Sequence, residues 1–508
     1  MSERPVRVRF APSPTGPLHI GGVRTALYNY LFAKQHGGKF LLRIEDTDQK
    51  RFVPGAEEYI NESLAWLGLT VDEGVKEGGE YGPYKQSERM DMYASYAHQL
   101  VSEDKAYYAF DTPDEINAMK ERLMANNMAA KYDAISRMSM KNSLTLSSDE
   151  VKEKLQNGDD YVVRIKLPRN EEIRFHDIIR GWIVFNSSQL DDKVLLKGDG
   201  LPTYHLANIV DDHKMDISHV IRGEEWLPSA PLHVMLYRYL GWEDTMPQFA
   251  HLPLILRPDG KGKLSKRDGD KLGIPVFPLE WHAADGEKSS GYRESGFMPN
   301  AVVNLLAMLG WHPSDNKELF TVDELVQAFS LERVSKSGAK FDIDKAKWYN
   351  HQYLMSATSD ELLALIKDDL EPMHTALGQE YLVRVLDMLK EKVSFANDIL
   401  PLGEYFFRLP TKYDEGVQNK KWNSEVANHI HNYVDDLIAN NWKNAAEMEN
   451  HLQSYADNSG INKGTLMQPL RWAISGQAGG PPIFEMMELI GLDSIAERVK
   501  IARLKHAL

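Results

Sequence analysis

The chain has 508 residues, a length that exceeds what one hydrophobic core holds and predicts about three domains or more. Its composition, 43% hydrophobic and 26% charged, is ordinary for a soluble enzyme. No apolar run approaches the roughly 20 residues that span a bilayer, and the first residues lack a signal-peptide core, so we expect a cytoplasmic protein without a membrane partner. The absence of cysteine excludes disulfides, thiolate catalysis and cysteine zinc sites. The net charge of −15 argues against nonspecific coating of nucleic acid but allows a local basic patch.

The chain opens with a strand, a turn, a helix and a second strand. Residues 6–11 form an apolar strand pattern that prolines and a glycine end. Apolar residues then recur with helical spacing over residues 20–36, and residues 39–44 form the second strand. A crossover of this kind joins parallel strands, and ligands of such sheets lie beyond the carboxyl ends of the strands. We therefore expect residues 13–22 and Glu45 on one rim, where a helix start can offer N–H groups to phosphate.

A second segment, residues 263–267, places two lysines, a serine and an arginine on an expected loop. Taken alone, a turn before a helix is most often only a turn, and His19 at a helix start is often only a cap. Together the two segments supply an imidazole and movable cations for phosphates, which favours nucleotidyl transfer from ATP. The first segment matches neither a G-x-G-x-x-G fingerprint nor a P-loop, so dehydrogenase and P-loop interpretations are disfavoured.

Residues 19–22 resemble the "HIGH" element of class I aminoacyl-tRNA synthetases, and residues 263–267 resemble their "KMSKS" element. Gly22 stands where the class pattern has histidine and Arg267 where it has serine, variants common in the glutamate branch. The segments similar to bacterial-type glutamyl-tRNA synthetases are residues 9–16, 43–48, 202–208, 220–226 and 468–471. The resemblance covers nearly the whole chain. Residues 272–292 depart from the family pattern, and we expect a surface insertion there without an assigned role.

The resemblance implies ATP-dependent ligation of L-glutamate to tRNA-Glu in two steps. Glutamate and ATP would give glutamyl-adenylate and pyrophosphate, and the glutamyl group would then pass to the 3′-terminal ribose of the tRNA. ATP is a substrate, Mg²⁺ is expected to bridge its phosphates, and no zinc is expected. The expected partners are tRNA-Glu, L-glutamate and ATP, with the protein a monomer. Whether tRNA-Gln is also charged stays open.

The resemblance also assigns site residues. The catalytic residues would be His19, Lys263 and Lys266. The ATP-binding residues would be Pro14, Thr15, Gly16, His19, Gly21, Gly22, Leu264, Ser265 and Lys266. The glutamate-binding residues would be Arg9, Ser13, Glu45, Tyr204, Asn208 and Arg222.

Residue chemistry agrees with the assignment of the glutamate site. Arginines at strand ends suit bidentate carboxylate binding, and Glu45 suits the substrate ammonium. The alternative is that Arg222 merely pairs with Glu224 or Glu225. The acidic and histidine residues of 205–213 are too loosely spaced for a metal site and are better interpreted as a polar helix end.

The predicted fold is an α/β N-terminal half followed by an all-α C-terminal half. The predicted domains are a Rossmann-like catalytic domain (1–83 and 203–257), an α+β acceptor-end-binding insertion (84–202), a linking domain with the lysine loop (258–350), and two helical anticodon-binding subdomains (351–412 and 413–508). Helical periodicity dominates after residue 351, and no strand pattern competes there. Candidate anticodon contacts are Arg471 and Lys392. Lys390, two residues before Lys392, is an alternative to it.

Four alternatives stay open. A glutaminyl-tRNA synthetase shares the fold and steps but typically has a β-barrel anticodon region. A truncated relative that glutamylates a tRNA base lacks the helical half. A small-molecule nucleotidyltransferase would leave the helical half unexplained, and a non-catalytic RNA-binding paralogue should have lost His19 or Lys266.

Overall fold

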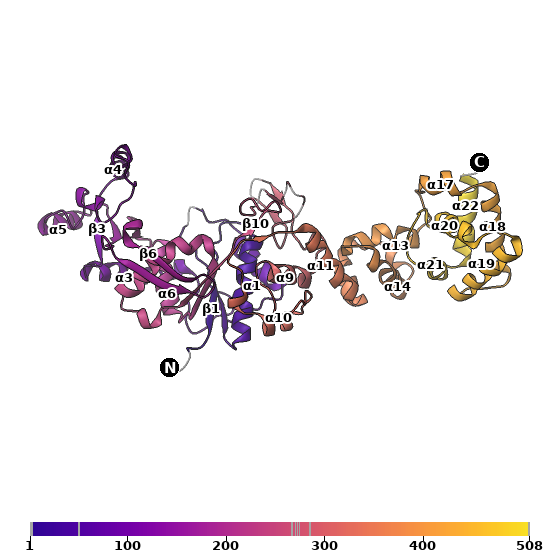
Figure 1. Ribbon diagram of the computed structural model, residues 1–508, viewed down its shortest axis with the longest axis horizontal. Coiled ribbons are helices and arrows are strands. Elements are labelled where there is room, and N and C mark those ends of the chain that lie inside the picture. Colours follow the sequence, from indigo (N-terminus) through magenta and orange to yellow (C-terminus); the bar gives the residue numbers. More distant parts are fainter. Residues whose placement is uncertain are drawn as a thin grey trace. The chain divides into compact units, whose positions relative to one another are not determined.

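The computed structural model describes residues 4–48, 51–265, 268–269, 271, 273, 275–283 and 286–505. The chain divides into two compact units (Figure 1). The first comprises residues 1–292 and 302–343, and the second comprises residues 293–301 and 344–508.

A six-stranded sheet forms the centre of the first unit. Its strands, in spatial order, are β2 (Lys39–Leu42), β1 (Arg7–Phe10), β8 (His219–Gly223), β9 (Gln248–Leu252), β5 (Glu172–Asp177) and β6 (Gly181–Asn186). All neighbouring pairs are parallel except β5 and β6. Because β2 and β8 flank β1 on opposite sides, the chain changes direction across the sheet at β1, where open parallel sheets bind ligands. The predicted Rossmann-like arrangement is confirmed.

Amphipathic helices cover this sheet. Helix α1 (Ile20–Gln35) packs against β1, β2 and β8, with Val23, Leu27 and Leu31 fully buried at helical spacing. Helix α7 (Ala230–Tyr239) packs against β5 and against α6 (Tyr204–Lys214), and α10 (Val322–Ala328) packs against α1. The first unit also contains α2 (Ala56–Trp66), and α9 (Pro299–Met308) begins in the second unit and continues in the first. Along the described part of the chain, no helix is both long enough and apolar enough to cross a membrane.

The segment predicted as an insertion contributes to two sheets. A three-stranded sheet joins β3 (Ala106–Ala109), β4 (Val162–Ile165) and β7 (Val194–Leu196), together with α3 (Met90–Ser102), α4 (Pro113–Ala125) and α5 (Ser148–Asn157). Figure 1 shows α4 and α5 beyond β3, on the side away from β1. Strands β5 and β6 instead extend the central sheet, because alternate residues of β5 are buried in the core and its last residue pairs with β9.

The expectation of a surface insertion at residues 272–292 agrees with the exposure of most described residues of 282–290, but it is wrong for residues 275–279 and 291–292, which are buried. Val276, Phe277, Leu279 and Tyr292 are all buried in the first unit. The hydroxyl of Tyr59 accepts a hydrogen bond from the Leu279 N–H at 3.1 Å and donates to the Leu279 carbonyl at 2.5 Å. A short hairpin, β11 (Trp281–His282) and β12 (Lys288–Ser289), adds to this segment. Leu272 lies outside the described residues.

Two further short strands, β10 (Ile255–Leu256) and β13 (Ala339–Lys340), pair in parallel. The lysine loop lies between them in the sequence. The backbone N–H of Leu264 donates to the carbonyl of Ile255 at 2.8 Å, so the described start of that loop is tied to β10.

The second unit contains only helices among the residues described, which confirms the all-α prediction. Its longer helices are α11 (Ile343–Ser356), α14 (Gln379–Leu389), α18 (Ser424–Ala439), α19 (Ala445–Ser459), α20 (Lys463–Ser475), α21 (Ile483–Ile490) and α22 (Leu492–Lys505), and its shorter ones are α12 (Ser359–Leu365), α13 (Pro372–Thr375), α15 (Ile399–Leu402), α16 (Glu404–Phe407) and α17 (Glu415–Lys421). Helix α20 has a weak local signal, since Gly464 and Pro469 both interrupt a helical pattern. Pro469 is nevertheless buried within the helix, where tertiary packing outweighs propensity.

Candidate active site

A cavity of about 1070 Å³ lies beyond the carboxyl ends of β1 and β8. Many of the predicted residues line it: Arg9, Ser13, His19, Gly21, Gly22, Glu45, Tyr204, Asn208, Arg222, Lys263, Leu264 and Ser265. Pro14, Thr15 and Gly16 are described but do not line it. Lys266 and Arg267 lie outside the described residues. The sheet order therefore brings residues from both ends of the first unit's sequence to one wall.

The start of α1 forms its own cap at this wall. The Nδ1 atom of His19 accepts a hydrogen bond from the Gly21 N–H at 3.1 Å, and the His19 carbonyl accepts from the backbone N–H groups of Gly22 and Val23. The N–H of Ile20 donates to the carbonyl of Val276 at 3.0 Å. The first N–H groups of α1 thus already have partners within the protein, contrary to the expectation that they would be open to phosphate. What remains at this helix start is its dipole and the imidazole.

At the fourth position of the "HIGH"-like element, a side chain would require Leu18 to move. A Cβ atom built on Gly22 would lie 2.7 Å from Leu18 Cδ1. Glycine therefore fits the local packing at this position.

Arg222 presents a cation to the cavity from the end of β8. Its Nη1 donates to the hydroxyl of Tyr204 at 2.8 Å. Glu224 pairs with Arg180 at 2.6 Å and Glu225 pairs with Lys263 at 2.6 Å. The alternative in which Arg222 serves only to pair with Glu224 or Glu225 is therefore wrong.

Arg9, the other expected carboxylate anchor, has a different environment. Its Nε and Nη2 donate to both oxygens of Asp212 at 2.9 and 3.2 Å, and Arg43 Nη1 donates to the same carboxylate at 2.7 Å. Burial acts to raise the pKa of Asp212, but the charges of Arg9 and Arg43 outweigh it and lower that pKa. Arg9 lines the cavity with its charge largely balanced, so the geometry does not support it as an equal second anchor.

The two aspartates of α6 lie in its last turn, in agreement with the interpretation as a polar helix end, but the interpretation did not include their burial. Asp211 and Asp212 are fully buried. Asp211 accepts hydrogen bonds from Arg89, Gln86 and Tyr93. Two adjacent acids inside an apolar helix were the available signal for a buried ion-pair network, because buried carboxylates require partners.

Glu45 lies beside this network and faces the cavity. Its Oε1 accepts from Arg43 Nη2 at 2.8 Å and from Asn208 Nδ2 at 3.3 Å. Burial raises the pKa of Glu45, and the charge of Arg43 opposes that shift. A carboxylate held in this way is suited to receive a substrate ammonium group.

The described part of the lysine loop completes the opposite wall. Lys263 is half exposed and paired with Glu225. The N–H and hydroxyl of Ser265 both donate to Asp268 Oδ2, at 2.8 and 2.6 Å. Among the residues that the structure describes, no group of three or more His, Cys, Asp or Glu side chains is arranged to hold a metal ion.

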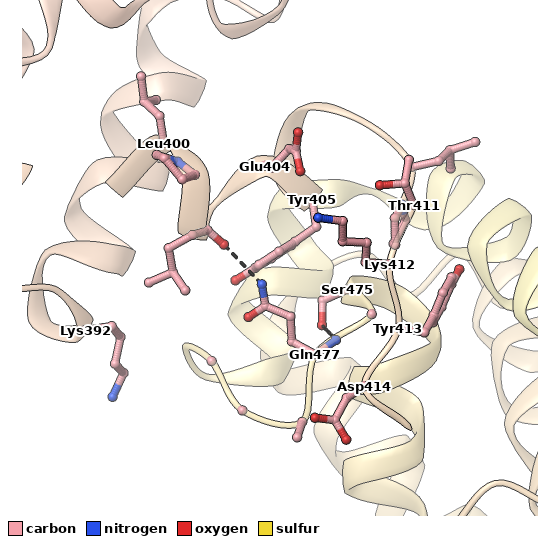
Figure 2. Close-up of a pocket in the computed structure, with 18 of the residues that line it drawn as sticks. Lys392, Leu400, Glu404, Tyr405, Thr411, Lys412, Tyr413, Asp414, Ser475 and Gln477 are labelled. Atoms are coloured by element: carbon pink, nitrogen blue, oxygen red, sulfur yellow. Dashed lines mark hydrogen bonds between the residues drawn. The ribbon is translucent and has the colours of Figure 1, made fainter. Parts of the chain in front are cut away.

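The helical unit contains a second cavity, also of about 1070 Å³. Figure 2 shows Tyr405, Lys412 and Gln477 close together at one side of it and Lys392 apart from them. Arg471 is not part of its lining but lies directly behind it, since a Cβ atom on Gly480 would be 2.9 Å from Arg471 Nη1. That nitrogen is buried and forms no hydrogen bond to any described residue. Burial lowers the pKa of Arg471.

The parallel sheet with its cavity at the point of reversal, the histidine-capped helix start and the lysine-bearing loop define a nucleotide-activating enzyme built on a Rossmann-like fold. Residues 5–348 match the family described as tRNA synthetases class I (E and Q), catalytic domain, and residues 355–503 match the family described as anticodon binding domain. The chain belongs to this class I tRNA synthetase family.

Relatives and solved structures agree along the full length. The chain is 55% identical to a glutamate–tRNA ligase of Cytophaga hutchinsonii over 99% of its own length and 98% of that protein. It is 54% identical to one of Phocaeicola vulgatus over 99% of both chains. A crystal structure of a glutamate tRNA ligase from Elizabethkingia meningosepticum in complex with its amino acid has a TM-score of 0.93 at 47% identity, covering 98% of this chain and 99% of that one.

Proposed function

We propose that this protein ligates L-glutamate to tRNA-Glu in two ATP-dependent steps. The observation that carries the proposal is the similarity of both units, over essentially the whole chain, to relatives named glutamate–tRNA ligase. The cavity at the reversal point of the sheet agrees with this function, because it combines a cation for a carboxylate with a carboxylate for an ammonium.

In the first step a glutamate carboxylate oxygen attacks the α-phosphorus of ATP and pyrophosphate leaves. Catalysis of such a step is mostly positioning and charge stabilisation. His19 would face the α-phosphate region, and Lys263 and Lys266 would follow charge onto the pyrophosphate. Lys263 would first have to exchange its partner Glu225 for phosphate, which an exposed ion pair permits at little cost. ATP would enter as its magnesium complex, and the metal would supply positive charge that offsets the charge of the phosphates.

Glutamate would lie between Arg222 and Glu45. Arg222 would hold the side-chain carboxylate, and Tyr204, which accepts from Arg222, keeps its own hydroxyl proton to donate to the same group. Glu45 would hold the substrate ammonium. Ser13 and Asn208 complete the wall, and Arg9 contributes there mainly through its pair with Asp212. A glutamine side chain has no charge to match Arg222, which favours glutamate.

In the second step the terminal ribose hydroxyl of the tRNA attacks the adenylate, whose phosphate can accept the proton. We assign the acceptor-end contacts to residues 84–202 and the anticodon contacts to the helical unit, with Arg471 and Lys392 as candidates. Arg471 is the stronger candidate because its Nη1 is buried without a described partner. We expect the protein to act as a cytoplasmic monomer.

The alternatives are less well supported. The described part of residues 351–505 contains only helices, whereas glutaminyl-tRNA synthetases typically carry a β-barrel there. A small-molecule nucleotidyltransferase would have no use for this helical unit, and the truncated relative would lack it.

Glutamate-dependent exchange of pyrophosphate into ATP, with and without added tRNA, tests the proposal. Exchange with glutamate but not with glutamine or aspartate is expected. Exchange that requires tRNA would show that the RNA completes the active site, whereas exchange without it would indicate a preassembled site. No exchange under either condition would refute the proposed function.

A further inference from the structure

The carboxyl ends of β8, β9 and β5 carry a buried chain of three polar side chains at the wall of the active-site cavity. Arg222 and His251 are register partners on β8 and β9, and Asp177 ends the next strand, β5. Arg222 Nε donates to His251 Nε2 over 3.1 Å, and His251 Nδ1 lies 2.6 Å from Asp177 Oδ2. Asp177 and His251 are fully buried and Arg222 nearly so. Of the three, only Arg222 lines the cavity.

These bonds determine which nitrogen of His251 carries the proton. The Nε–H of Arg222 can only donate, so Nε2 of His251 must accept. A ring whose Nε2 accepts carries at most one proton and is neutral. Burial, which lowers the pKa of His251 although the bond to Asp177 opposes this shift, acts in the same direction. Its single proton is therefore on Nδ1, where it is donated to Asp177.

Asp177 is itself held by the backbone. Its Oδ1 accepts from the N–H groups of Ile179 and Arg180, at 3.0 and 2.8 Å, and its Oδ2 accepts from the N–H of His251 at 3.1 Å. The orientation of the histidine thus follows from main-chain atoms of the three-residue turn that joins β5 to β6 and of β9 itself.

The remaining contacts of Arg222 are also to neutral acceptors. Nη1 donates to the Tyr204 hydroxyl and lies 3.4 Å from His233 Nδ1, while Nη2 donates to the Trp226 carbonyl at 3.4 Å. Burial lowers the pKa of His233 well below its usual value, and the charge of Arg222 adds to that shift. In the described part of the protein Arg222 pairs with no carboxylate, so its orientation is fixed while its charge stays uncompensated.

We propose that Asp177 and His251 are positioning residues that hold the Arg222 guanidinium ready for the substrate side-chain carboxylate without neutralising it. The inference rests on the proposed role of Arg222 as the glutamate anchor. A carboxylate in place of His251 would hold Arg222 equally well but would compete with the substrate for its charge. A neutral histidine locked in one tautomer orients the cation and leaves its charge for glutamate.

Substitutions at His251 test the proposal through the KM for glutamate. His251→Leu removes the acceptor for Arg222 Nε and should raise this KM about 10- to 100-fold, the cost of losing a hydrogen bond to a charged group. The KM for ATP should change by less than about twofold and kcat far less than the glutamate KM, because the contact serves ground state and transition state alike. His251→Gln can accept from Arg222 and donate to Asp177, so it should stay within about threefold of the wild-type KM for glutamate.

The matched control is His219→Gln. His219 begins the same strand as Arg222 and is a partly buried histidine whose pKa is also lowered by burial, to about 4, but it does not line the cavity. This variant should leave the KM for glutamate unchanged. Circular dichroism melting of each variant shows whether it is folded.

Nitrogen-15 spectra of wild-type His251 give a test that needs no variant. The Nδ1–H tautomer supports the proposal, and an Nε2–H tautomer or a protonated ring at neutral pH overturns it. A His251→Leu variant with wild-type KM for glutamate also overturns it. Arg222→Gln distinguishes failure of the proposed anchor from failure of the positioning role. An unchanged KM for glutamate in Arg222→Gln would show that Arg222 is not the anchor. A raised KM for glutamate in Arg222→Gln, together with an unchanged one in His251→Leu, would overturn only the positioning role.

Discussion

Replacing Asp212 by asparagine should destabilise the first unit strongly. The Asp212 carboxylate accepts three hydrogen bonds, two from Arg9 and one from Arg43, in a site that excludes water. The amide introduced by Asp212→Asn would turn a donor toward these two cations and remove the charge that balances them. Breaking a buried ion pair by removing one partner costs about 3–5 kcal/mol.

The matched control is Asp104→Asn. Asp104 also pairs with a cation, Lys166, at 2.6 Å, but its side chain is 74% exposed. Its φ of 57° is one that asparagine adopts readily, so backbone strain does not enter the comparison. An exposed pair contributes about 1 kcal/mol or less.

Hydrogen–deuterium exchange measured on peptides from β1 and α6 reports the free energy of local opening of these two elements, which carry Arg9 and Asp212. A loss of about 3–5 kcal/mol should raise the exchange rates of these strand and helix amides about 100- to 4,000-fold in Asp212→Asn, since about 1.4 kcal/mol corresponds to a factor of ten. Asp104→Asn should raise them about fivefold at most. Equal effects of the two variants on these exchange rates would refute the conclusion that the Arg9–Asp212–Arg43 network stabilises β1 and α6.

Three further predictions concern the loop, the helical unit and acid stability. Lys266→Ala should slow adenylate formation by about 10²- to 10³-fold with tRNA affinity nearly unchanged, and a fully active variant in pyrophosphate exchange would remove the loop from the mechanism. Arg471→Gln should raise the KM for tRNA about tenfold and leave the KM for glutamate unaltered. If the variant binds tRNAs with different anticodons equally more weakly, Arg471 contacts a phosphate, and if it no longer discriminates between them, Arg471 contacts a base. An unchanged KM for tRNA would show that Arg471 makes no contact with the tRNA. Burial lowers the pKa of His205 from 6.5 to about 4, so the unfolded chain binds more protons between these values and stability falls as the pH drops from 6.5 toward 4. The fall is at most about 1.4 kcal/mol per pH unit. His205→Asn should make this fall shallower in urea unfolding, and an identical pH profile would contradict the assignment.

The rim of the active site could be predicted because its signals are local. A strand that stops at prolines, a helical period and a second strand lie within the first 44 residues, and they are enough to place His19 and Glu45 at the carboxyl ends of parallel strands. The local signal for helix α20 is weak, since Gly464 and Pro469 both disfavour a helix, although Pro469 is buried within it. Residues 272–292 departed from the family pattern, and nothing local to them indicates that Tyr59, far away in sequence, holds Leu279.

The partners of the site residues were beyond local patterns. Asp212 meets Arg9 across 203 positions of sequence, and His251 meets Asp177 across 74. Such contacts depend on strand order, which composition and periodicity do not determine. The sequence could therefore indicate that Arg9 and Arg222 belong to one cavity. It could not indicate that a carboxylate balances the charge of Arg9 but not that of Arg222 in the described structure.

That difference follows from the sheet. Arg9 lies near the end of β1 and faces α6, where Asp212 neutralises it, whereas Arg222 lies near the end of β8 beside β9, whose register places a histidine next to it. A compensated arginine attracts a carboxylate weakly, because the ligand must compete with an ion pair already formed, and a buried pair resists that exchange. An arginine held by neutral acceptors retains its charge, and in a cavity of low dielectric that charge acts strongly on a bound anion. We therefore expect selection of an acidic side chain to depend on the arginine that lacks a carboxylate neighbour, which among the two arginines compared, in the described structure, is Arg222.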